Sequence, residues 1–207
     1  GLLSRAGQGF WSGGTPPYGY DLAYFSVDGR FLMTVRYDQD CGKTILNEDG
    51  EIIRRVPRGE TLSLTKRDRC RLVPSAPERV EVLRNIFTWY AREGLGFKGI
   101  ADRLNQQKIP SPRGGKWSST HGDMWAMASI RSMIENPAYV GDMVWNRLTS
   151  GKFHRISQGH AVPRRGIPGG GPEHNRPDDW IVVRDAHPAL ISRTLFEEAQ
   201  RKKALRG

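Results

Sequence analysis

The sequence predicts an α+β protein: an N-terminal β-hairpin region followed by a three-helix, helix-turn-helix-like subdomain, a short strand pair and a C-terminal helix. Three observations lead to this prediction. Apolar residues alternate around Asp-Gly turns between residues 21 and 72, a pattern typical of hairpins. After residue 75 the apolar spacing changes to that of helices. The length of 207 residues allows one domain or two small ones.

Residues 1–20 are predicted to form an extended arm, because glycines interrupt the segment and Pro16-Pro17 disfavours a helix there. Two hairpins follow, one centred on Asp28-Gly29 and the other on Asp49-Gly50, each between alternating apolar runs. An Asp-Gly pair favours a tight hairpin because both turn positions need a positive φ. We therefore expect at least two hairpins in residues 21–72.

The helical subdomain is predicted over residues 75–137. Its first helix starts at Ser75-Ala76-Pro77-Glu78, which has capping-box spacing, and ends at Gly94, a residue type common just after a helix. The second helix has apolar residues at helical spacing from Phe97 onward and must stop before Pro110. The connection to the third helix is much longer than the 3–4 residues of a standard helix-turn-helix.

The third helix is predicted to start at Asp123 or Ser129 and to end before Pro137. Trp89, Trp145 and Trp180 are expected in the core rather than stacked on bases. The remaining elements are, in chain order, a strand at 139–145, a basic Gly/Pro-rich loop at 148–178, a short strand at 180–183 and a helix at 195–205.

Positive charge is unevenly distributed along the chain. The total of 32 Lys and Arg against 22 Asp and Glu gives a net charge of +10. Residues 21–50 contain more acidic than basic groups, whereas 51–72, 98–117 and 147–176 are strongly basic. Segregated basic segments favour a surface for a polyanion such as nucleic acid. Loops kept soluble by charge remain the alternative interpretation.

The sequence leads us to expect neither a membrane protein nor a secreted one. No apolar run approaches the roughly 18 residues that a membrane span needs, and no basic-then-apolar start suggests a signal peptide. Two cysteines are too few for a disulfide scaffold, and reduced thiols in a cytosolic protein are the simpler interpretation.

Several local sequences resemble, in consistent order, the recombinase (DNA-binding) domain of the large serine recombinases, the phage integrases and transposon resolvases with long C-termini. The resemblance spans about residues 13–200. The segments that carry it are 13–20 (GGTPPYGY), 78–90 (ERVEVLRNIFTWY), 99–105 (GIADRLN), 109–117 (IPSPRGGKW), 129–141 (SIRSMIENPAYVG), 180–183 (WIVV) and 185–191 (DAHPALI).

The resemblance implies that a serine in a separate N-terminal domain attacks the DNA phosphodiester. The nucleophile of that family lies in a Tyr-x-Arg-x-Ser motif, and the nearest match here, Tyr90-Ala91-Arg92-Glu93-Gly94, ends in glycine. We therefore expect no catalytic residue, no enzyme activity, no cofactor and no metal in this chain. The expected partner is a double-stranded DNA attachment half-site, bound by a parent protein that is a dimer on each site and a tetramer in synapsis. The expected location is the cytoplasm, as a bacterial or phage-encoded, nucleoid-associated protein.

The same resemblance divides the chain into four expected parts. Residues 1–20 are the linker from a missing catalytic domain, and 21–147 are the DNA-binding domain, with hairpins at 21–72 and helices at 75–137. Residues 148–178 form a flexible basic loop. Residues 179–207 return as a strand and a helix that leads towards a missing zinc-ribbon domain.

Two sets of side chains are predicted to contact DNA. Arg113 and Lys116 flank Gly114-Gly115, where a close approach suits phosphate contacts, and in helix-turn-helix proteins residues near the last helix reach base edges. For Asn136, Pro137 and Tyr139 we expect a structural role. The predicted DNA-binding residues are Arg54, Arg55, Arg67, Arg69, Arg113, Lys116, Ser118, Ser119, Thr120, His121 and Arg131.

Two departures from the family pattern accompany these assignments: a longer β region at 21–72 and an insertion at 118–128. Two other functions stay open at this point. One is a stand-alone winged-helix-like DNA-binding regulator. The other is a metal-dependent nuclease that would use Glu173, Asp178, Asp179 and nearby histidines. A metal site formed by Cys41, Cys70 and His187 is a further alternative, although these residues lack the spacing of a zinc-binding motif.

Overall fold

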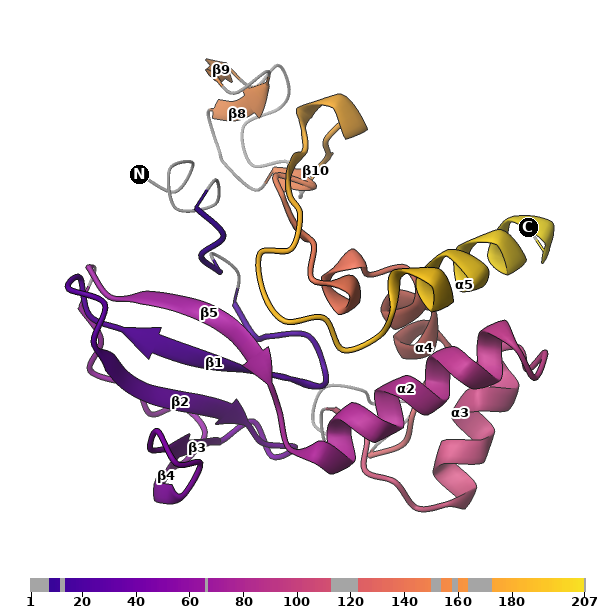
Figure 1. Ribbon diagram of the computed structural model, residues 1–207, viewed down its shortest axis with the longest axis horizontal. Coiled ribbons are helices and arrows are strands. Elements are labelled where there is room, and N and C mark those ends of the chain that lie inside the picture. The colour runs from indigo at the N-terminus through magenta and orange to yellow at the C-terminus, as the bar shows by residue number, and fades with distance from the viewer. Residues whose placement is uncertain are drawn as a thin grey trace.

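A five-stranded antiparallel sheet forms the N-terminal part of the computed structural model (Figure 1). The structure describes residues 8–11, 14–65, 67–112, 123–149, 154–157, 160–163 and 173–206. The strands of the sheet lie in the order β4-β3-β2-β1-β5. Their bounds are Tyr20–Phe25 for β1, Phe31–Tyr37 for β2, Lys43–Leu46 for β3, Ile52–Val56 for β4 and Arg69–Pro74 for β5.

Both predicted hairpins are confirmed. β1 pairs with β2, and β3 pairs with β4. Only the glycine of each Asp-Gly pair has the expected positive φ, 81° at Gly29 and 82° at Gly50, whereas Asp28 and Asp49 do not. Such angles suit glycine, which has no Cβ to clash with the backbone. Residues 57–68 then carry the chain from the β4 edge to the opposite edge, where β5 pairs with β1.

One face of the sheet supplies half of the core. The strand register places Leu22 between Val35 and Leu72, with Ile45 beyond Val35. All four side chains are buried. This is the face expected from the alternation, because successive side chains of a strand point to opposite sides.

Four α-helices follow in the described part of the chain, labelled α2 (Pro77–Ala91), α3 (Phe97–Gln106), α4 (Met127–Ile134) and α5 (Arg193–Arg206). α2 packs beside α5, and α3 packs against α4 (Figure 1). Their apolar faces join the sheet in one hydrophobic core, whose fully buried helical members include Leu83, Ile86, Phe87, Ile100, Leu104 and Ile130. The fold is therefore α+β, as predicted.

The predicted capping box at the start of α2 is wrong. The N-cap residue is Ala76, and its side chain makes no capping hydrogen bond. The Ser75 hydroxyl instead donates to Asp21 Oδ1 at 2.8 Å, and Arg36 Nε donates to the other oxygen of Asp21 at 3.0 Å. Burial raises the pKa of Asp21, and Arg36 and Ser75 oppose that rise. Ser75 therefore hydrogen-bonds to a buried carboxyl group instead of capping the helix. A buried carboxyl group without hydrogen bonds costs more free energy than an uncapped helix end.

The segment after α4 also differs from the prediction of one strand at 139–145. Pro137–Val140 forms a 3₁₀ helix, η1, whose start is capped by the Asn136 side chain accepting from the Ala138 backbone N–H at 3.1 Å. Only Met143–Trp145 forms a strand, β6. It pairs antiparallel with β11 (Ile181–Val183), which confirms the predicted short strand pair. The structural role expected for Asn136 is confirmed by this cap.

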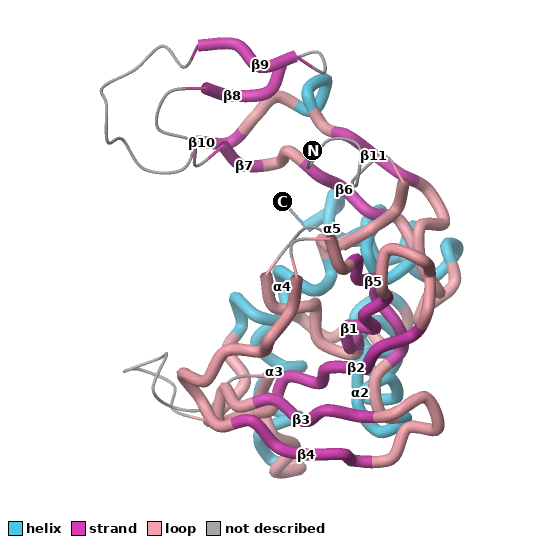
Figure 2. Tube along the Cα trace, turned by 90° about the vertical axis from the view of Figure 1, so that its left-hand side faces the viewer, coloured by secondary structure: helices cyan, strands magenta, loops and turns pink. Residues whose placement is uncertain are grey.

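Between β6 and β11 the structure describes four short strands and a 3₁₀ helix, η2 (Pro177–Asp179). In Figure 2 β8 and β9 lie at the end of the molecule opposite β4. β7 (Leu148–Thr149) pairs with β10 (Glu173–His174), and β8 (His154–Ser157) pairs with β9 (His160–Pro163).

Candidate nucleic-acid interface

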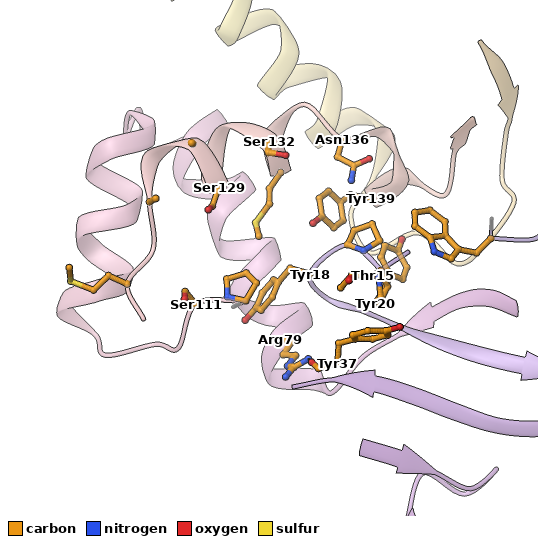
Figure 3. A pocket seen from close by; sticks show the side chains of 18 residues that line it. Thr15, Tyr18, Tyr20, Tyr37, Arg79, Ser111, Ser129, Ser132, Asn136 and Tyr139 are labelled. Atoms are coloured by element: carbon orange, nitrogen blue, oxygen red, sulfur yellow. The ribbon is translucent and has the colours of Figure 1, made fainter. Parts of the chain in front are cut away.

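A groove of about 700 Å³ runs between the N-terminal arm and α4. We call it the arm–helix groove. In Figure 3 Ser129, Ser132 and Asn136 lie on one side, with Tyr18, Tyr37 and Arg79 across from them. The other polar residues that line it are Trp11, Thr15, Ser111, Tyr20 and Tyr139. Of the described residues that line the groove, none is acidic.

The arm wall is held against the edge of the sheet. The Trp11 backbone N–H donates to the Cys70 carbonyl at 2.8 Å, and the Cys70 thiol lies 3.3 Å from the Trp11 carbonyl. The Trp11 indole N–H donates to the Gly14 carbonyl at 3.1 Å, which ties the two described pieces of the arm together. Cys70 lies in the edge strand β5, so the arm covers part of an edge that would otherwise expose its backbone groups.

The α4 wall is anchored by Trp125, which is 2% exposed. The Asn105 side chain of α3 accepts from the Trp125 backbone N–H at 2.8 Å and donates to its carbonyl at 3.1 Å. The Trp125 indole N–H donates to the Ile109 carbonyl at 3.0 Å, and its ring meets Tyr18 edge-on at 5.2 Å. These contacts fix the start of α4 on α3 despite the 20-residue connection 107–126.

Small side chains make up much of the α4 surface that faces the groove. Ala128 and Ser132 are exposed, and Ser129 is half-buried. They are spaced three and four residues apart, so they share one helix face, while Ile130, Met133 and Ile134 lie in the core. Short side chains allow a ligand to approach the helix backbone closely, and hydroxyl groups can donate to phosphate or base acceptors.

The floor of the groove joins the sheet to the helical region. The Tyr20 hydroxyl lies 2.8 Å from the carbonyl oxygens of both Ala138 and Pro188. The Tyr20 ring stacks on Tyr139 at 6.1 Å and meets His187 edge-on at 5.1 Å. Burial raises the pKa of both tyrosines far above its usual range. These hydroxyls therefore remain protonated donors.

His187 is buried at the same junction. Its Nε2 lies 2.7 Å from the Ala138 carbonyl oxygen, which only accepts hydrogen bonds, so this nitrogen carries the proton. Burial lowers the pKa of His187, and the Ala138 hydrogen bond and nearby Asp142 oppose that change. The imidazole is consequently neutral at physiological pH and acts as a structural donor.

A second hollow of about 460 Å³ adjoins the groove and shares Trp11, Ala128, Ser132 and Asn136 with it. Arg131 lines this hollow but is paired with Glu135 at 3.0 Å, and Lys203 of α5 reaches the same carboxylate at 2.7 Å. Hydrogen bonds from Lys203 and Arg131 lower the pKa of Glu135. Arg131, predicted to read bases, therefore lies on the exposed face of α4 and is restrained by an ion pair.

The predicted sheet arginines fall on different surfaces. Arg54 and Arg55 are neighbours on β4 and point to opposite faces, and Arg54 pairs with Glu60 at 3.4 Å. Arg67 is exposed in the connection before β5. Arg69 lies on β5 beside the arm. The predicted residues Arg113, Lys116, Ser118, Ser119, Thr120 and His121 lie outside the described residues.

Local sequence patterns did not indicate the roles of Trp11, Arg79 and Trp125. Arg79 lines the groove from α2, where its guanidinium donates to the Tyr37 carbonyl at 3.0 Å. Trp125 falls in the segment interpreted as an insertion, although a tryptophan is a large side chain that is mostly buried on average and is itself a signal of an anchor. Trp11 could have been noticed for the same reason. Long-range contacts, not local pattern, give all three their positions.

The metal sites considered from the sequence receive no support. Among the described residues, no three His, Cys, Asp or Glu side chains come together in a way that could hold a metal ion. This includes the set of Cys41, Cys70 and His187 and the described carboxylates of the nuclease alternative, Glu173, Asp178 and Asp179. Within the same described residues, no helix has the length and apolar character needed to cross a bilayer.

Comparison with known proteins gives one positive finding. The model of the family described as Recombinase matches residues 77–206, which cover α2 through α5 and the α4 wall of the groove. No curated protein matches the chain.

Proposed function

This chain belongs to the Recombinase family, as the recombinase domain of the large serine recombinases, and on that premise we propose that it binds double-stranded DNA sequence-specifically. In its parent protein this binding would position a catalytic serine domain at the crossover site for integration and strand exchange. The family acts in site-specific recombination, so its substrate is DNA.

The observation that carries the proposal is the arm–helix groove. It combines hydroxyl, amide and guanidinium donors with an absence of carboxylates among its described lining residues. Such a groove attracts a polyanion, and about half to two-thirds of protein–DNA hydrogen bonds go to the sugar–phosphate backbone from side chains of these kinds. The net charge of +10 adds a long-range attraction.

The size of the groove indicates what enters it. A volume of about 700 Å³ is too small for a duplex, whose major groove alone is about 12 Å wide. It suits one sugar–phosphate strand. We therefore infer that the exposed face of α4 lies in the major groove, as in helix-turn-helix proteins. The strand that borders that groove would run between α4 and the arm, within reach of Ser129, Ser132 and Arg79.

The chain by itself is proposed to cut no DNA. Within the described residues the groove contains serine hydroxyls, but no histidine or carboxylate lines it to act as their base. The role inferred here is binding and positioning, with strand cleavage assigned to a serine domain of the parent protein.

A charge reversal in the groove tests the proposal. We expect Ser132→Asp to weaken binding of duplex DNA at physiological salt by about tenfold or more, because a carboxylate would face phosphate oxygens in a confined site. The matched control is Ser63→Asp, since Ser63 is exposed in the connection between β4 and β5. Fluorescence anisotropy with a labelled duplex measures both. Equal affinities of the two variants would contradict the proposed groove.

Sequence preference needs a separate measurement. Selection from random duplexes of roughly three helical turns, followed by sequencing of the bound fraction, should yield a consensus half-site. If no sequence is enriched and the dissociation constants are about 10⁻⁴–10⁻⁶ M, the chain contacts only the DNA backbone.

A further inference from the structure

Two arginines of the edge strand β5 share one aromatic ring of the arm. The guanidinium carbons of Arg69 and Arg71 lie 5.0 Å and 4.9 Å from the centroid of the Phe10 ring. The two residues are two positions apart on β5, so their side chains leave the same face of the strand, about 7 Å apart at the backbone. Both distances lie within the roughly 6 Å range of a cation–π contact.

Neither arginine pairs with an acidic side chain of the described residues. In the described part of the chain, Arg69 and Arg71 have no ion pair, and the rings and groups that contact them include no carboxylate. Asp68, the adjacent acid, instead accepts from the Thr65 backbone N–H at 2.7 Å. Two like charges held on one ring repel each other, so an anion placed between them would be favoured.

The arrangement is built into the fold. Phe10 is only 9% exposed, although it belongs to the arm. Gly9 beside it has a φ of 74°, and a Cβ there would lie 3.4 Å from the Ala186 side chain. On the other side, Trp11 is hydrogen-bonded to the Cys70 carbonyl between the two arginines. The ring is therefore fixed by contacts before and after it.

We propose that Arg69, Arg71 and Phe10 form a clamp for one phosphodiester group of the DNA backbone. The guanidinium group matches phosphate because it offers planar pairs of N–H donors. Phe10 acts as a positioning residue that holds the two guanidinium groups side by side. The site rests on the proposed function, and it extends the arm–helix groove, since the adjoining Trp11 lines that groove.

The first test compares the salt dependence of DNA binding by two double variants of the full 207-residue chain. Arg69→Ala/Arg71→Ala should reduce the slope of log K against log salt by about 0.9 per lost phosphate contact and weaken binding about tenfold. The matched control is Arg92→Ala/Lys98→Ala, which removes the same charge from two exposed residues that already pair with Glu198 and Asp102. Identical slopes for the two double variants would overturn the clamp.

The second test locates the phosphate. Each phosphodiester of the selected half-site is replaced in turn by a neutral methylphosphonate. At one position the wild-type chain should lose affinity while Arg69→Ala/Arg71→Ala loses no more, because the contact is already absent. Losses that are additive at every position would overturn the assignment.

The role of Phe10 is tested by Phe10→Leu, which keeps an apolar side chain and all charges but removes the π face. We expect a several-fold loss of affinity that disappears when the located phosphate is neutral. A loss of the same size on the neutral duplex would indicate a merely structural role, and the thermal midpoint of the variant identifies misfolding directly.

Failure of the clamp and failure of the proposed function are separable. If the wild-type chain binds a consensus half-site and Arg69→Ala/Arg71→Ala binds it equally well, the clamp is wrong and the proposed function stands. If the wild-type chain binds no duplex, the proposed function falls. Titration with inorganic phosphate, followed by the Nε–Hε NMR signals of Arg69 and Arg71, then tests the anion site by itself, and unmoved signals would overturn it too.

Discussion

Arginines in the helical region and arginines at the β5 edge are used in different ways. In the helical region three arginines pair with carboxylates, namely Arg92 with Glu198, Arg103 with Glu93 and Arg131 with Glu135. At the β5 edge, Arg69 and Arg71 contact an aromatic ring, and among the described residues they have no acidic partner. Both regions contribute to the same net positive charge.

This difference shows why net charge is a poor guide to binding residues. A paired arginine must leave its carboxylate before it contacts a phosphate, and exposed pairs contribute at most about 1 kcal/mol to stability. An arginine held on a ring has an ordered side chain and an uncompensated charge. It therefore contributes its full charge to a polyanion ligand without first breaking an ion pair.

The largest effect is expected from Trp125→Ala, which removes the side chain that anchors α4 in the helical region. Loss of a buried tryptophan should lower the free energy of unfolding by about 3–5 kcal/mol, because the indole packs edge-on against Tyr18 and donates to the Ile109 carbonyl. Urea denaturation measures the loss. The control is Trp180→Ala, which removes a half-buried indole near the other end of the chain and should cost less.

If Trp125→Ala still folds, it separates the two regions functionally. The displaced α4 should lose sequence preference, while Arg69 and Arg71 continue to hold the DNA backbone. Retention of the consensus by this variant would contradict the placement of α4 in the major groove.

The next effect is a pH dependence at the junction of the two regions. Burial holds the pKa of His187 below its ordinary value of 6.5. Well above pH 6.5 the residue is neutral in both the folded and the unfolded state and contributes no pH dependence. Below that pH the unfolded chain binds the proton more readily, so the free energy of unfolding falls as the pH is lowered.

Urea denaturation between about pH 7.5 and about pH 5 measures this slope, and its part due to His187 is the difference from His187→Gln. Equal slopes for the wild type and the variant would show that the imidazole titrates alike in the folded and unfolded states.

Glu135→Gln would make the cations beside α4 resemble Arg69 and Arg71, because it removes the carboxylate with which they pair. The substitution releases Arg131 and Lys203 from their shared carboxylate. We expect affinity for duplex DNA to rise several-fold and its salt dependence to steepen by about one contact. Stability should fall by no more than about 1 kcal/mol, since these pairs are still partly exposed to solvent. Unchanged affinity would show that neither cation reaches DNA.

The smallest effect is expected from Arg54→Ala. Arg54 is a sheet arginine that behaves like those of the helical region, because it pairs with Glu60 and is 57% exposed. Its removal should change DNA affinity less than twofold and stability by less than about 0.5 kcal/mol. Anisotropy titrations beside Arg69→Ala make the contrast direct. A loss of DNA affinity as large as that of Arg69→Ala would show that Arg54 belongs to the binding surface.

Local features of the sequence determined much of the fold. The Asp-Gly pairs place both hairpins because a tight turn depends on a few adjacent residues. The apolar spacing of α2 and α3 predicts their buried faces for a similar reason, and α5 was expected from the final helical segment. The same local sequences indicate the family, which the match over residues 77–206 confirms.

Other predictions depended on contacts that no local pattern contains. Ser75 has the spacing of a helix cap, yet it bonds to Asp21, 54 residues away. Arg54, Arg69 and Arg131 look alike in sequence, and only the folded chain shows that two of them have acidic partners.

What the sequence by itself determined is the two hairpins and the main helices in their order, the excess of positive charge and the family, but not the short strands β7 to β10, which lie in the segment predicted as a loop. What only the tertiary structure decided is where that charge remains uncompensated. The arm meets β5 across 59 residues, through Trp11 and Cys70, and Phe10 meets Arg69 and Arg71 across a similar distance. The physical reason is that turns and helix faces follow from neighbouring residues, whereas charge compensation depends on which distant side chains the packed core brings together.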